Sequence, residues 1–273
     1  MTKIKNHYTR ILNNSPEQSI ALNDRGLNYG DGFFTTAKVV NGQVVHWNFH
    51  KLRLIECQQR LGFPEFNFQD LECAIINFCS DQDLAVLKIL ITRGSGGRGY
   101  AQPLQQKPIQ VLTLMPYPDN YQNLQLSGLE LEISQIKLGL QPLLAGMKTL
   151  NRMEQVLIKQ DIVKNQCHDA LVLDLNNNVI ETSIANVVCY AKGQWLTPKL
   201  DLAGIKGVYR EYLMSKIHFD EVNISVSEFK NMDAVFCCNS LMGLVPIKSV
   251  QEASFDLELA SQIKKDMMSN TKH

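Results

Sequence analysis

The sequence lacks an excess of either charge. Its 273 residues include 27 Lys+Arg and 27 Asp+Glu, so the formal net charge is zero. Without a basic excess, we expect neither nucleic acid nor an anionic membrane as a partner. No run approaches the roughly 18 uninterrupted apolar residues of a membrane-spanning helix, and residues 1–20 lack the apolar stretch typical of a signal peptide. These features predict a soluble, cytoplasmic protein.

Paired metal-ligand spacing is missing as well. The seven cysteines are an odd number and include no C-x-x-C pair, and most of them have apolar neighbours. The six histidines show no metal-ligand spacing either. We therefore expect buried, reduced thiols and no metal site.

Internal repeats and low-complexity segments are also absent, so local patterns carry the fold prediction. Residues 33–40 and 44–47 flank Asn41-Gly42, a dipeptide typical of a type I′ hairpin turn. A helix is predicted to follow, with Asn48 as its N-cap. The first clear unit expected along the chain is therefore a β-hairpin followed by a helix.

A linker is predicted at residues 115–120, which contain two prolines and lie near mid-chain. It would separate a smaller α+β domain, 1–118, from a larger α/β domain, 119–273. In the second part, a helix is expected over 151–166, with Asn151 and Glu154 spaced as in a capping box.

Strands outnumber helices in this prediction, and the two do not alternate strictly. The expected strands after the hairpin are 85–92, 109–114, 129–136, 170–173, 185–190, 195–197, a strand near 222, and 234–238. This order favours an α+β or mixed α/β fold over a doubly wound sheet.

Residues 94–99 match the dinucleotide pattern G-x-G-x-x-G and follow a predicted strand. That fingerprint must begin a helix whose N-terminus binds the pyrophosphate. The next residues are Tyr-Ala-Gln-Pro, ending at Pro103, so we expect no helix there and no bound dinucleotide. Two interpretations stay open, a surface loop or a substrate loop that presents Arg98.

Lys148 differs from the other lysines because it lies in the apolar run 143–150, just before a predicted helix. Apolar surroundings lower the pKa of a lysine, and a neutral amine can form a Schiff base with a carbonyl compound. Alternatively, Lys148 extends from the end of an apolar strand into solvent.

Five blocks of sequence, in order, carry a specific resemblance. They are DRGLNYGDGFFTTA (24–37), AGMKTLNRMEQ (145–155), VIETSIANV (179–187), AGIKGVYR (203–210) and CNSLM (238–242). Together they resemble the class IV pyridoxal-phosphate enzymes, and within that class the 4-amino-4-deoxychorismate lyases. The resemblance extends from about Asp24 to Pro246. It implies a two-domain enzyme of fold type IV, similar to D-amino-acid aminotransferases, with pyridoxal 5'-phosphate as cofactor.

The resemblance implies roles for two residues in the chemistry of the cofactor. Lys148 would form a Schiff base with the cofactor and then move the substrate proton. Glu181 would hydrogen-bond the pyridine nitrogen, and its negative charge would keep that nitrogen protonated, so that the ring can accept electrons.

The resemblance also implies a binding site for the cofactor phosphate. Arg53 matches the family's phosphate-binding arginine, and a guanidinium group suits bidentate contact with phosphate. Gly207 and Val208 begin a predicted helix, whose free N–H groups attract anions. Asn239 and Ser240 follow a predicted strand and would add backbone and hydroxyl donors.

Two positions separate lyases from aminotransferases in this comparison. Phe34 stands where the related D-amino-acid aminotransferases carry a tyrosine, and Thr36 is part of the Thr-Thr pair of the lyases. Because side chains alternate along a strand, Phe34 and Thr36 are expected on one face. Arg98 would bind a substrate carboxylate. An arginine on this loop can serve the neighbouring subunit in this family, which implies a homodimer.

The implied reaction converts 4-amino-4-deoxychorismate to 4-aminobenzoate, a folate precursor, and pyruvate. Lys148 would remove the C4 proton, and Thr36 or Lys148 would assist protonation as pyruvate leaves. The alternatives are an aminotransferase of the same fold, acting on D-amino or branched-chain amino acids, and a non-catalytic relative. Lys206, near the phosphate-binding block, has no assigned role.

Overall fold

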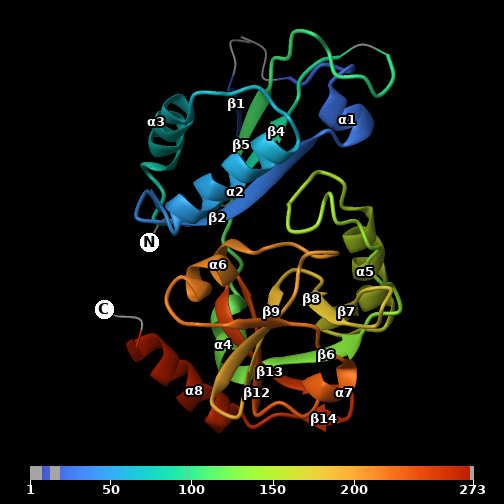
Figure 1. The fold of residues 1–273 in the computed structure, drawn as a ribbon. Coiled ribbons are helices and arrows are strands. Elements are labelled where there is room, and N and C mark those ends of the chain that lie inside the picture. Colours follow the sequence, from blue (N-terminus) through green and yellow to red (C-terminus); the bar gives the residue numbers. More distant parts are fainter. Residues whose placement is uncertain (1–7, 13–18, 97, 271–273) are drawn as a thin grey trace. The chain divides into compact units, whose positions relative to one another are not determined.

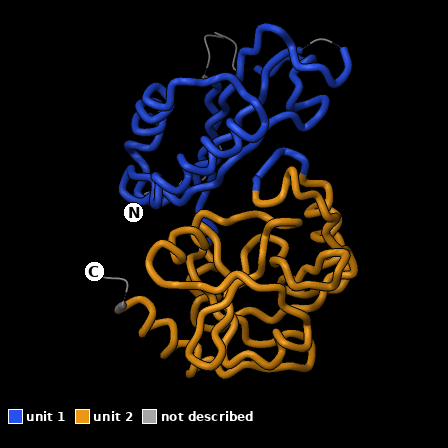
Figure 2. The backbone as a smooth tube through the Cα atoms, in the orientation of Figure 1, with its two compact units in different colours: residues 1–118, 147–151 blue, residues 119–146, 152–273 orange. Residues whose placement is uncertain are grey.

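The computed structural model describes residues 8–12, 19–96 and 98–270 (Figure 1). The chain divides into two compact units (Figure 2). The first comprises Met1–Pro118 and Met147–Asn151, and the second comprises Asp119–Gly146 and Arg152–His273. Helices and strands follow one another without strict alternation, as expected for a mixed fold.

The first unit contains a five-stranded antiparallel sheet in the order β1-β5-β4-β2-β3. Three helices accompany it, and α2 contacts β2. The elements are β1 (Tyr8–Leu12), α1 (Arg25–Tyr29), β2 (Gly32–Val40), β3 (Gln43–Val44), α2 (Trp47–Arg60), α3 (Phe68–Cys79), β4 (Leu84–Thr92) and β5 (Ile109–Met115).

The hairpin between β2 and β3 confirms the turn prediction, since Asn41 and Gly42 have φ angles of 49° and 76°. The second strand is shorter than predicted, and α2 begins at Trp47. The N-cap prediction was wrong, because the cap is His46, in a left-handed conformation without a side-chain cap bond. The indole N–H of Trp47, the first residue of α2, donates to Glu72 of α3 at 2.8 Å.

Strand β2 has two different faces, as alternation predicts. Phe33 and Thr35 are completely buried, whereas Phe34 and Thr36 are partly exposed. Phe34 and Thr36 therefore share the more open face of the sheet. Helix α2 covers the buried face, since Thr35 of this face contacts His50 of α2.

The second unit contains a nine-stranded sheet in the order β11-β10-β9-β12-β13-β6-β7-β8, with β14 beside β13. Because β8 also pairs with β9, six of these strands close into a barrel-like ring. The elements are α4 (Tyr121–Ser127), β6 (Leu129–Ile133), α5 (Met153–Lys164), β7 (Asp169–Leu173), β8 (Val179–Thr182), β9 (Asn186–Ala191), β10 (Gln194–Pro198), α6 (Val208–Met214), β11 (Asp220–Val222), α7 (Val226–Phe229), β12 (Ala234–Asn239), β13 (Gly243–Val250), β14 (Ala253–Ser254) and α8 (Leu257–Asn270).

Alternating side chains of this sheet supply different apolar clusters. Val187 and Cys237 belong to one cluster, whereas their neighbours Val188 and Phe236 belong to another that includes Ile263 of α8. A third cluster joins residues of α5 to β7 and β8 (Leu138, Ile158, Ile162, Ala170, Val172, Ile180, Leu200 and Ala203). The sheet is therefore packed on both faces, which explains why its strands are nearly continuous apolar runs.

The segment around Lys148 differs from the expectation that it belongs with 119–273. Met147–Asn151 is part of the first unit. The N–H of Phe34 donates to the carbonyl of Lys148, and the N–H of Leu150 donates to the carbonyl of Gly32, both at 2.9 Å. These bonds attach the segment to β2, which explains the difference.

The capping box predicted at Asn151 and Glu154 is absent, because both side chains have other partners. Helix α5 begins at Met153, with Arg152 as a cap that makes no side-chain cap bond. Asn151 donates to the carbonyl of Gly30, and Glu154 accepts the N–H of Gly139 at 2.7 Å.

The other sequence features have plain structural outcomes. No helix begins in the described residues 98–108, in agreement with the rejection of a dinucleotide fingerprint. All seven cysteines are free, and Cys57, Cys79, Cys189, Cys237 and Cys238 are buried. Among the described residues, none of the helices is long and apolar enough to cross a membrane.

Candidate active site

Lys148 lies half-buried beside the first residues of β2. Its Nζ is 4.8 Å from the centroid of the Phe34 ring, within the range of a cation–π contact. The Nζ of Lys88, on β4, is 4.9 Å from the same centroid. The ring of Phe34 thus has two amino groups beside it, and one of them is the amine for which the sequence predicts Schiff-base chemistry.

Thr36 lies on the same face of β2 as Phe34, and its cross-strand partner is Lys88. A hydroxyl group, an aromatic ring and two lysine side chains therefore share one region of this sheet. Such a set can bind an anionic substrate, form a Schiff base and move protons. Lys88 is the member that sequence reasoning missed, because a lone lysine in an apolar strand resembles an ordinary surface residue.

Arg53 belongs to α2 and donates from Nη1 to the hydroxyl of Thr35 at 3.4 Å. Thr35 is also 2.6 Å from Nδ1 of His50. His50 is completely buried, and its pKa lies well below the ordinary value because of burial, followed by the nearby charges of Arg53 and His46. His50, expected to be structural, is thus a neutral group in direct contact with the threonine that contacts Arg53.

Glu181 lies at the point where the ring of strands closes. It belongs to β8, and its backbone partner on β9 is Asn186. The side chain is buried, and Oε2 accepts the N–H of Ile205 at 3.1 Å. This bond fixes the orientation of a buried carboxylate, as needed for a group that must hold a proton on a ring nitrogen.

Gly207 is the N-cap of α6, and Val208 is its first residue. A Cβ at position 207 would lie 1.9 Å from Oδ1 of Asn186, so α6 can begin here only with glycine unless Asn186 moves. Asn186 itself donates to the carbonyl of Ile205 at 2.7 Å. The start of α6 is therefore packed tightly against the strand that pairs with Glu181.

Asn239 and Ser240 lie at the end of β12. Oδ1 of Asn239 accepts the N–H groups of Leu241 and Met242, both at 2.9 Å, and Nδ2 donates to the carbonyl of Ile184. The side chain of Asn239 therefore shapes the turn. Its backbone, rather than its amide group, is the part suited to an anion.

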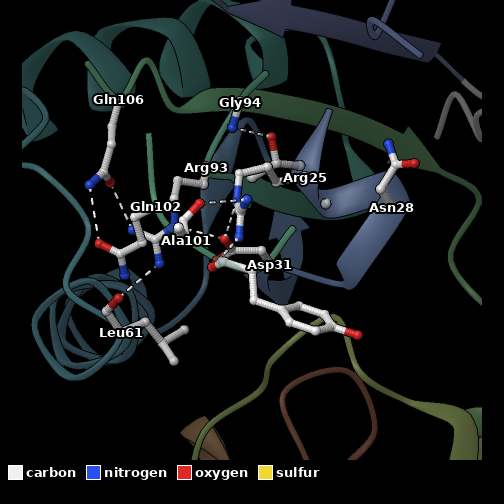
Figure 3. A network of polar contacts seen from close by, with 12 residues as sticks. Arg25, Asn28, Asp31, Leu61, Arg93, Gly94, Ala101, Gln102 and Gln106 are labelled. Carbon is white, nitrogen blue, oxygen red and sulfur yellow. Dashed lines mark hydrogen bonds and ion pairs between the residues drawn. The ribbon is translucent and has the colours of Figure 1, made fainter. Parts of the chain in front are cut away.

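Arg98 is exposed on the loop after β4. Two other arginines of the same unit, Arg25 and Arg93, are buried and converge on Asp31 (Figure 3). Sequence reasoning did not identify this group, since charged residues in loops are usually solvated.

Arg210 is another buried cation that the sequence prediction did not identify. It donates to the hydroxyl of Thr197 at 3.2 Å and forms ion pairs of 2.6 Å with Glu211 and Glu221. These contacts attach α6 to β10 and β11. Arg210 therefore supports the helix that begins at Gly207.

The predicted site residues thus fall into one set in each unit. Lys148, Phe34, Thr36, Arg53 and Arg98 belong to the first unit, whereas Glu181, Gly207, Val208, Asn239 and Ser240 belong to the second.

Comparison with known proteins identifies the family. The family model of amino-transferase class IV matches residues 32–250. Aminodeoxychorismate lyase of Vibrio harveyi is 34% identical over 244 residues, which cover 88% of this chain and 90% of that protein.

Solved structures agree with this assignment. The 4-amino-4-deoxychorismate lyase of Pseudomonas aeruginosa has a TM-score of 0.85 and 31% identity, covering 95% of this chain and 99% of the other. A hypothetical aminotransferase from Mycobacterium tuberculosis, in its PLP-bound form, has a TM-score of 0.81 at 16% identity and covers 97% and 98% of the two chains, which shows the shared fold. The chain therefore belongs to the class IV aminotransferase family.

Proposed function

We propose that the protein is a pyridoxal-phosphate-dependent lyase that converts 4-amino-4-deoxychorismate to 4-aminobenzoate and pyruvate, a step that supplies folate synthesis. Similarity to aminodeoxychorismate lyases over nearly the whole chain supports this reaction. The observation that carries the proposal is the arrangement of Lys148, Phe34 and Thr36. The amine lies against an aromatic ring that has no hydroxyl group, and a threonine hydroxyl lies on the same face of β2.

The donor set of the chain fits pyridoxal phosphate. When bound, this cofactor supplies an aldehyde for Schiff-base formation and a ring that accepts an electron pair. Lys148 would bind the aldehyde carbon, and the buried carboxylate of Glu181 would hold a proton on the pyridine nitrogen. The fixed orientation of Glu181, through its bond from Ile205, suits that role.

A second group of residues would bind the phosphate. Arg53 supplies a permanent positive charge, and its guanidinium group is oriented by Thr35. Gly207 and Val208 supply backbone N–H groups, with glycine allowing close approach at the start of α6. Asn239 and Ser240 supply the backbone and the hydroxyl group of the turn after β12.

In the proposed reaction, Nζ of Lys148 removes the proton from C4 of the substrate. The electron pair of the C4–H bond becomes part of the aromatic ring, and the pair of the C3–O bond leaves with the enolpyruvyl group. Thr36 or Lys148 would direct a proton to this leaving group, which becomes pyruvate. Arg98 would bind a substrate carboxylate, and the ring of Phe34 would form one side of the site. The atoms of the reaction balance without a water molecule and without a 2-oxo acid as amino-group acceptor.

An aminotransferase of the same fold is the second candidate, because the family model that matches describes aminotransferases. Its substrates would be D-amino or branched-chain amino acids. It would use Lys148 and Glu181 in the same way but would depend on a 2-oxo acid acceptor. The requirement for a 2-oxo acid therefore distinguishes the aminotransferase from the lyase.

The test is a product assay with the purified protein, pyridoxal phosphate and 4-amino-4-deoxychorismate, without any 2-oxo acid. The lyase predicts equal amounts of 4-aminobenzoate and pyruvate, and no product with Lys148→Ala. Lys159→Ala is the control, since Lys159 is exposed on α5. Failure of the wild type to form either product, with amino transfer to an added 2-oxo acid, would replace the lyase by the aminotransferase.

A cytoplasmic homodimer completes the proposal, and it rests on the family resemblance. Light scattering coupled to size-exclusion chromatography should give twice the chain mass of 30.9 kDa. Mixing Arg98→Ala with Lys148→Ala protein would test whether Arg98 serves the partner's site. Recovery of activity after subunit exchange is expected if it does, and none if each subunit uses its own arginine.

A further inference from the structure

We propose that Arg25, Asp31 and Arg93 form an arginine clamp that positions the loop carrying Arg98 for substrate binding. Asp31 is its central positioning residue, and it does not itself contact substrate. The inference rests on the proposed function, because Arg98 is given its substrate role there. All three residues belong to the first unit. Figure 3 shows Arg25, Asp31 and Arg93 close together.

One oxygen atom joins the two arginines. Oδ2 of Asp31 accepts from Nε of Arg25 and from Nε of Arg93, each at 2.8 Å. The guanidinium groups are almost completely buried, with side-chain exposures of 4% and 3%. Burial raises the pKa of Asp31, but the hydrogen bonds from Arg93 and Arg25 outweigh it and hold the pKa below the ordinary value. Asp31 is therefore a carboxylate at neutral pH, and it compensates two buried cations.

Arg25 uses its remaining donors on the loop backbone. Nη1 donates to the carbonyls of Gly99 and Ala101 at 3.2 and 3.1 Å, and Nη2 donates to the carbonyl of Tyr100 at 3.1 Å. Three consecutive carbonyls directly after Arg98 are thus bound by one side chain. Tyr100 also packs edge-on against Tyr29, with ring centroids 5.5 Å apart.

Arg93 binds the other end of the loop. Its Nη1 donates to Oε1 of Gln106 at 2.7 Å and to the carbonyl of Gly62 at 3.0 Å, and Nη2 donates to the carbonyl of Leu61 at 2.8 Å. The guanidinium carbon lies 4.0 Å from the centroid of the Phe63 ring. The loop is therefore connected to the end of α2 as well as to Asp31.

Two glycines, Gly94 and Gly96, allow close packing at the start of the loop. Gly94 has a φ of +85°, and a Cβ there would lie 2.1 Å from the carbonyl oxygen of Lys107. A Cβ at Gly96 would lie 2.6 Å from Cδ of Arg25. The N–H of Arg25 also donates to the carbonyl of Gly94 at 2.9 Å. Gly94 and Gly96 of this motif thus allow close packing around the clamp.

The clamp also connects the loop to the proposed reaction centre. Asp31 directly precedes β2, which carries Phe34 and Thr36, and its carbonyl accepts the N–H of Arg93 at 3.1 Å. A change in the Asp31 side chain should therefore act on Arg98 through the loop, and it should leave the lysine–cofactor bond intact.

Limited cleavage of the substrate-free protein by trypsin, which cuts after arginine, tests the clamp itself. Asp31→Asn keeps the size of the side chain but removes the charge that compensates two guanidinium groups. Because cleavage needs local opening of the chain, we expect cleavage after Arg98 to become at least about tenfold faster. Asp70→Asn, at an exposed position in α3, is the control. Unchanged cleavage after Arg98 would overturn the proposal.

Arg25→Lys provides a second variant if Asp31→Asn does not fold. Lysine keeps the positive charge but cannot donate to Asp31 and to three carbonyls together. Faster cleavage after Arg98 is expected here as well, and slower or equal cleavage would contradict the clamp.

Kinetics test the connection to Arg98. Asp31→Asn should raise KM for 4-amino-4-deoxychorismate about tenfold, while kcat and the absorption of the lysine-bound cofactor change little. In an Arg98→Ala background the same change should have less than about a twofold effect, because coupled residues are not additive. A tenfold effect in both backgrounds would assign Asp31 a general structural role.

The lyase function and the positioning role of Asp31 can be tested independently. If the wild type forms no 4-aminobenzoate, the proposed function fails, and the cleavage measurement still decides whether the clamp orders the loop. If the wild type is active and the variants behave additively, the positioning role fails while the lyase stands.

Discussion

The hydroxyl group of Thr35 lies 2.6 Å from Nδ1 of His50, and both side chains are completely buried. Because the oxygen of Thr35 also accepts from Arg53, its own hydrogen is available for Nδ1 of His50. Because Nδ1 accepts this hydrogen, the proton of the neutral ring is on Nε2, which is buried without a hydrogen-bond partner among the described residues. Thr35 thus links a neutral histidine to the arginine that we propose binds phosphate.

Thr35→Val should destabilise the protein, because it leaves Nδ1 of His50 buried and unsatisfied. The expected loss in the free energy of unfolding is about 1–3 kcal/mol, measured by urea denaturation. Thr113→Val on β5 is a matched control, since Thr113 is partly exposed and its hydroxyl contact is 3.5 Å long. Equal losses in the two variants would show that the contact with His50 contributes nothing.

Stability should fall as the pH is lowered below about 6.5. The pKa of His50 in the folded protein lies well below the ordinary 6.5, first because of burial and then because of Arg53 and His46. Below pH 6.5 the unfolded chain binds a proton that the folded chain does not, which stabilises the unfolded state. The slope for His50 approaches about 1.4 kcal/mol per pH unit, measured by urea denaturation between pH 7.5 and 5.5.

His50→Gln should remove this part of the pH dependence, leaving a smaller contribution from His46, whose pKa is also lowered by burial. His218→Gln, at an exposed position, should keep the slope of the parent protein. A slope unaffected by His50→Gln would mean that His50 is protonated in the folded protein.

Glu181→Gln should impair catalysis with little effect on folding. Glutamine can still accept the N–H of Ile205 but has no charge to hold a proton on the pyridine nitrogen. We expect kcat to fall by about 100-fold or more, with a melting temperature near that of the parent. Glu132→Gln, an exposed change on β6, should leave kcat unaltered. A similar kcat in both variants would remove Glu181 from the mechanism.

Gly207→Ala should weaken cofactor binding. The backbone at this position suits any residue, with φ of −69°, so the effect is steric and comes from the 1.9 Å approach to Asn186. A cost of about 1–3 kcal/mol corresponds to about a 5- to 150-fold loss of affinity, measured by titrating pyridoxal phosphate into apoprotein. Gly139→Ala meets only the end of the Glu154 side chain and is the control. Equal affinities would exclude the start of α6 from the phosphate site.

Local chemistry explains which parts of the fold could be predicted. The Asn41-Gly42 turn needs only its own two residues to adopt positive φ, so it was found from sequence. Strands β8 and β13 were missed, because β8 has only four residues, two of them polar, and β13 contains Pro246, a residue unusual inside a strand. The capping box failed because Glu154 found a distant partner, Gly139, that sequence spacing does not reveal.

The same limit applies to the site. Lys148 and Glu181 could be proposed as site residues because a family resemblance included them, and Lys148 also lies in an apolar run. The buried arginines of the clamp and Arg210 were missed, since burial of a cation depends on carboxylates and carbonyls brought together by the fold. Asp31 is six residues from Arg25 but 62 from Arg93, so no local window contains the group.

The attachment of Met147–Asn151 to β2 also affects how the protein is made. Residues 1–118 emerge first from the ribosome, yet their unit includes a segment that is synthesised only after Asp119–Gly146. The early domain must therefore wait for residue 151 before its last strand-like contact can form, unlike domains that complete folding in order of synthesis. Lys148 is then among the last parts of that unit to reach its final position.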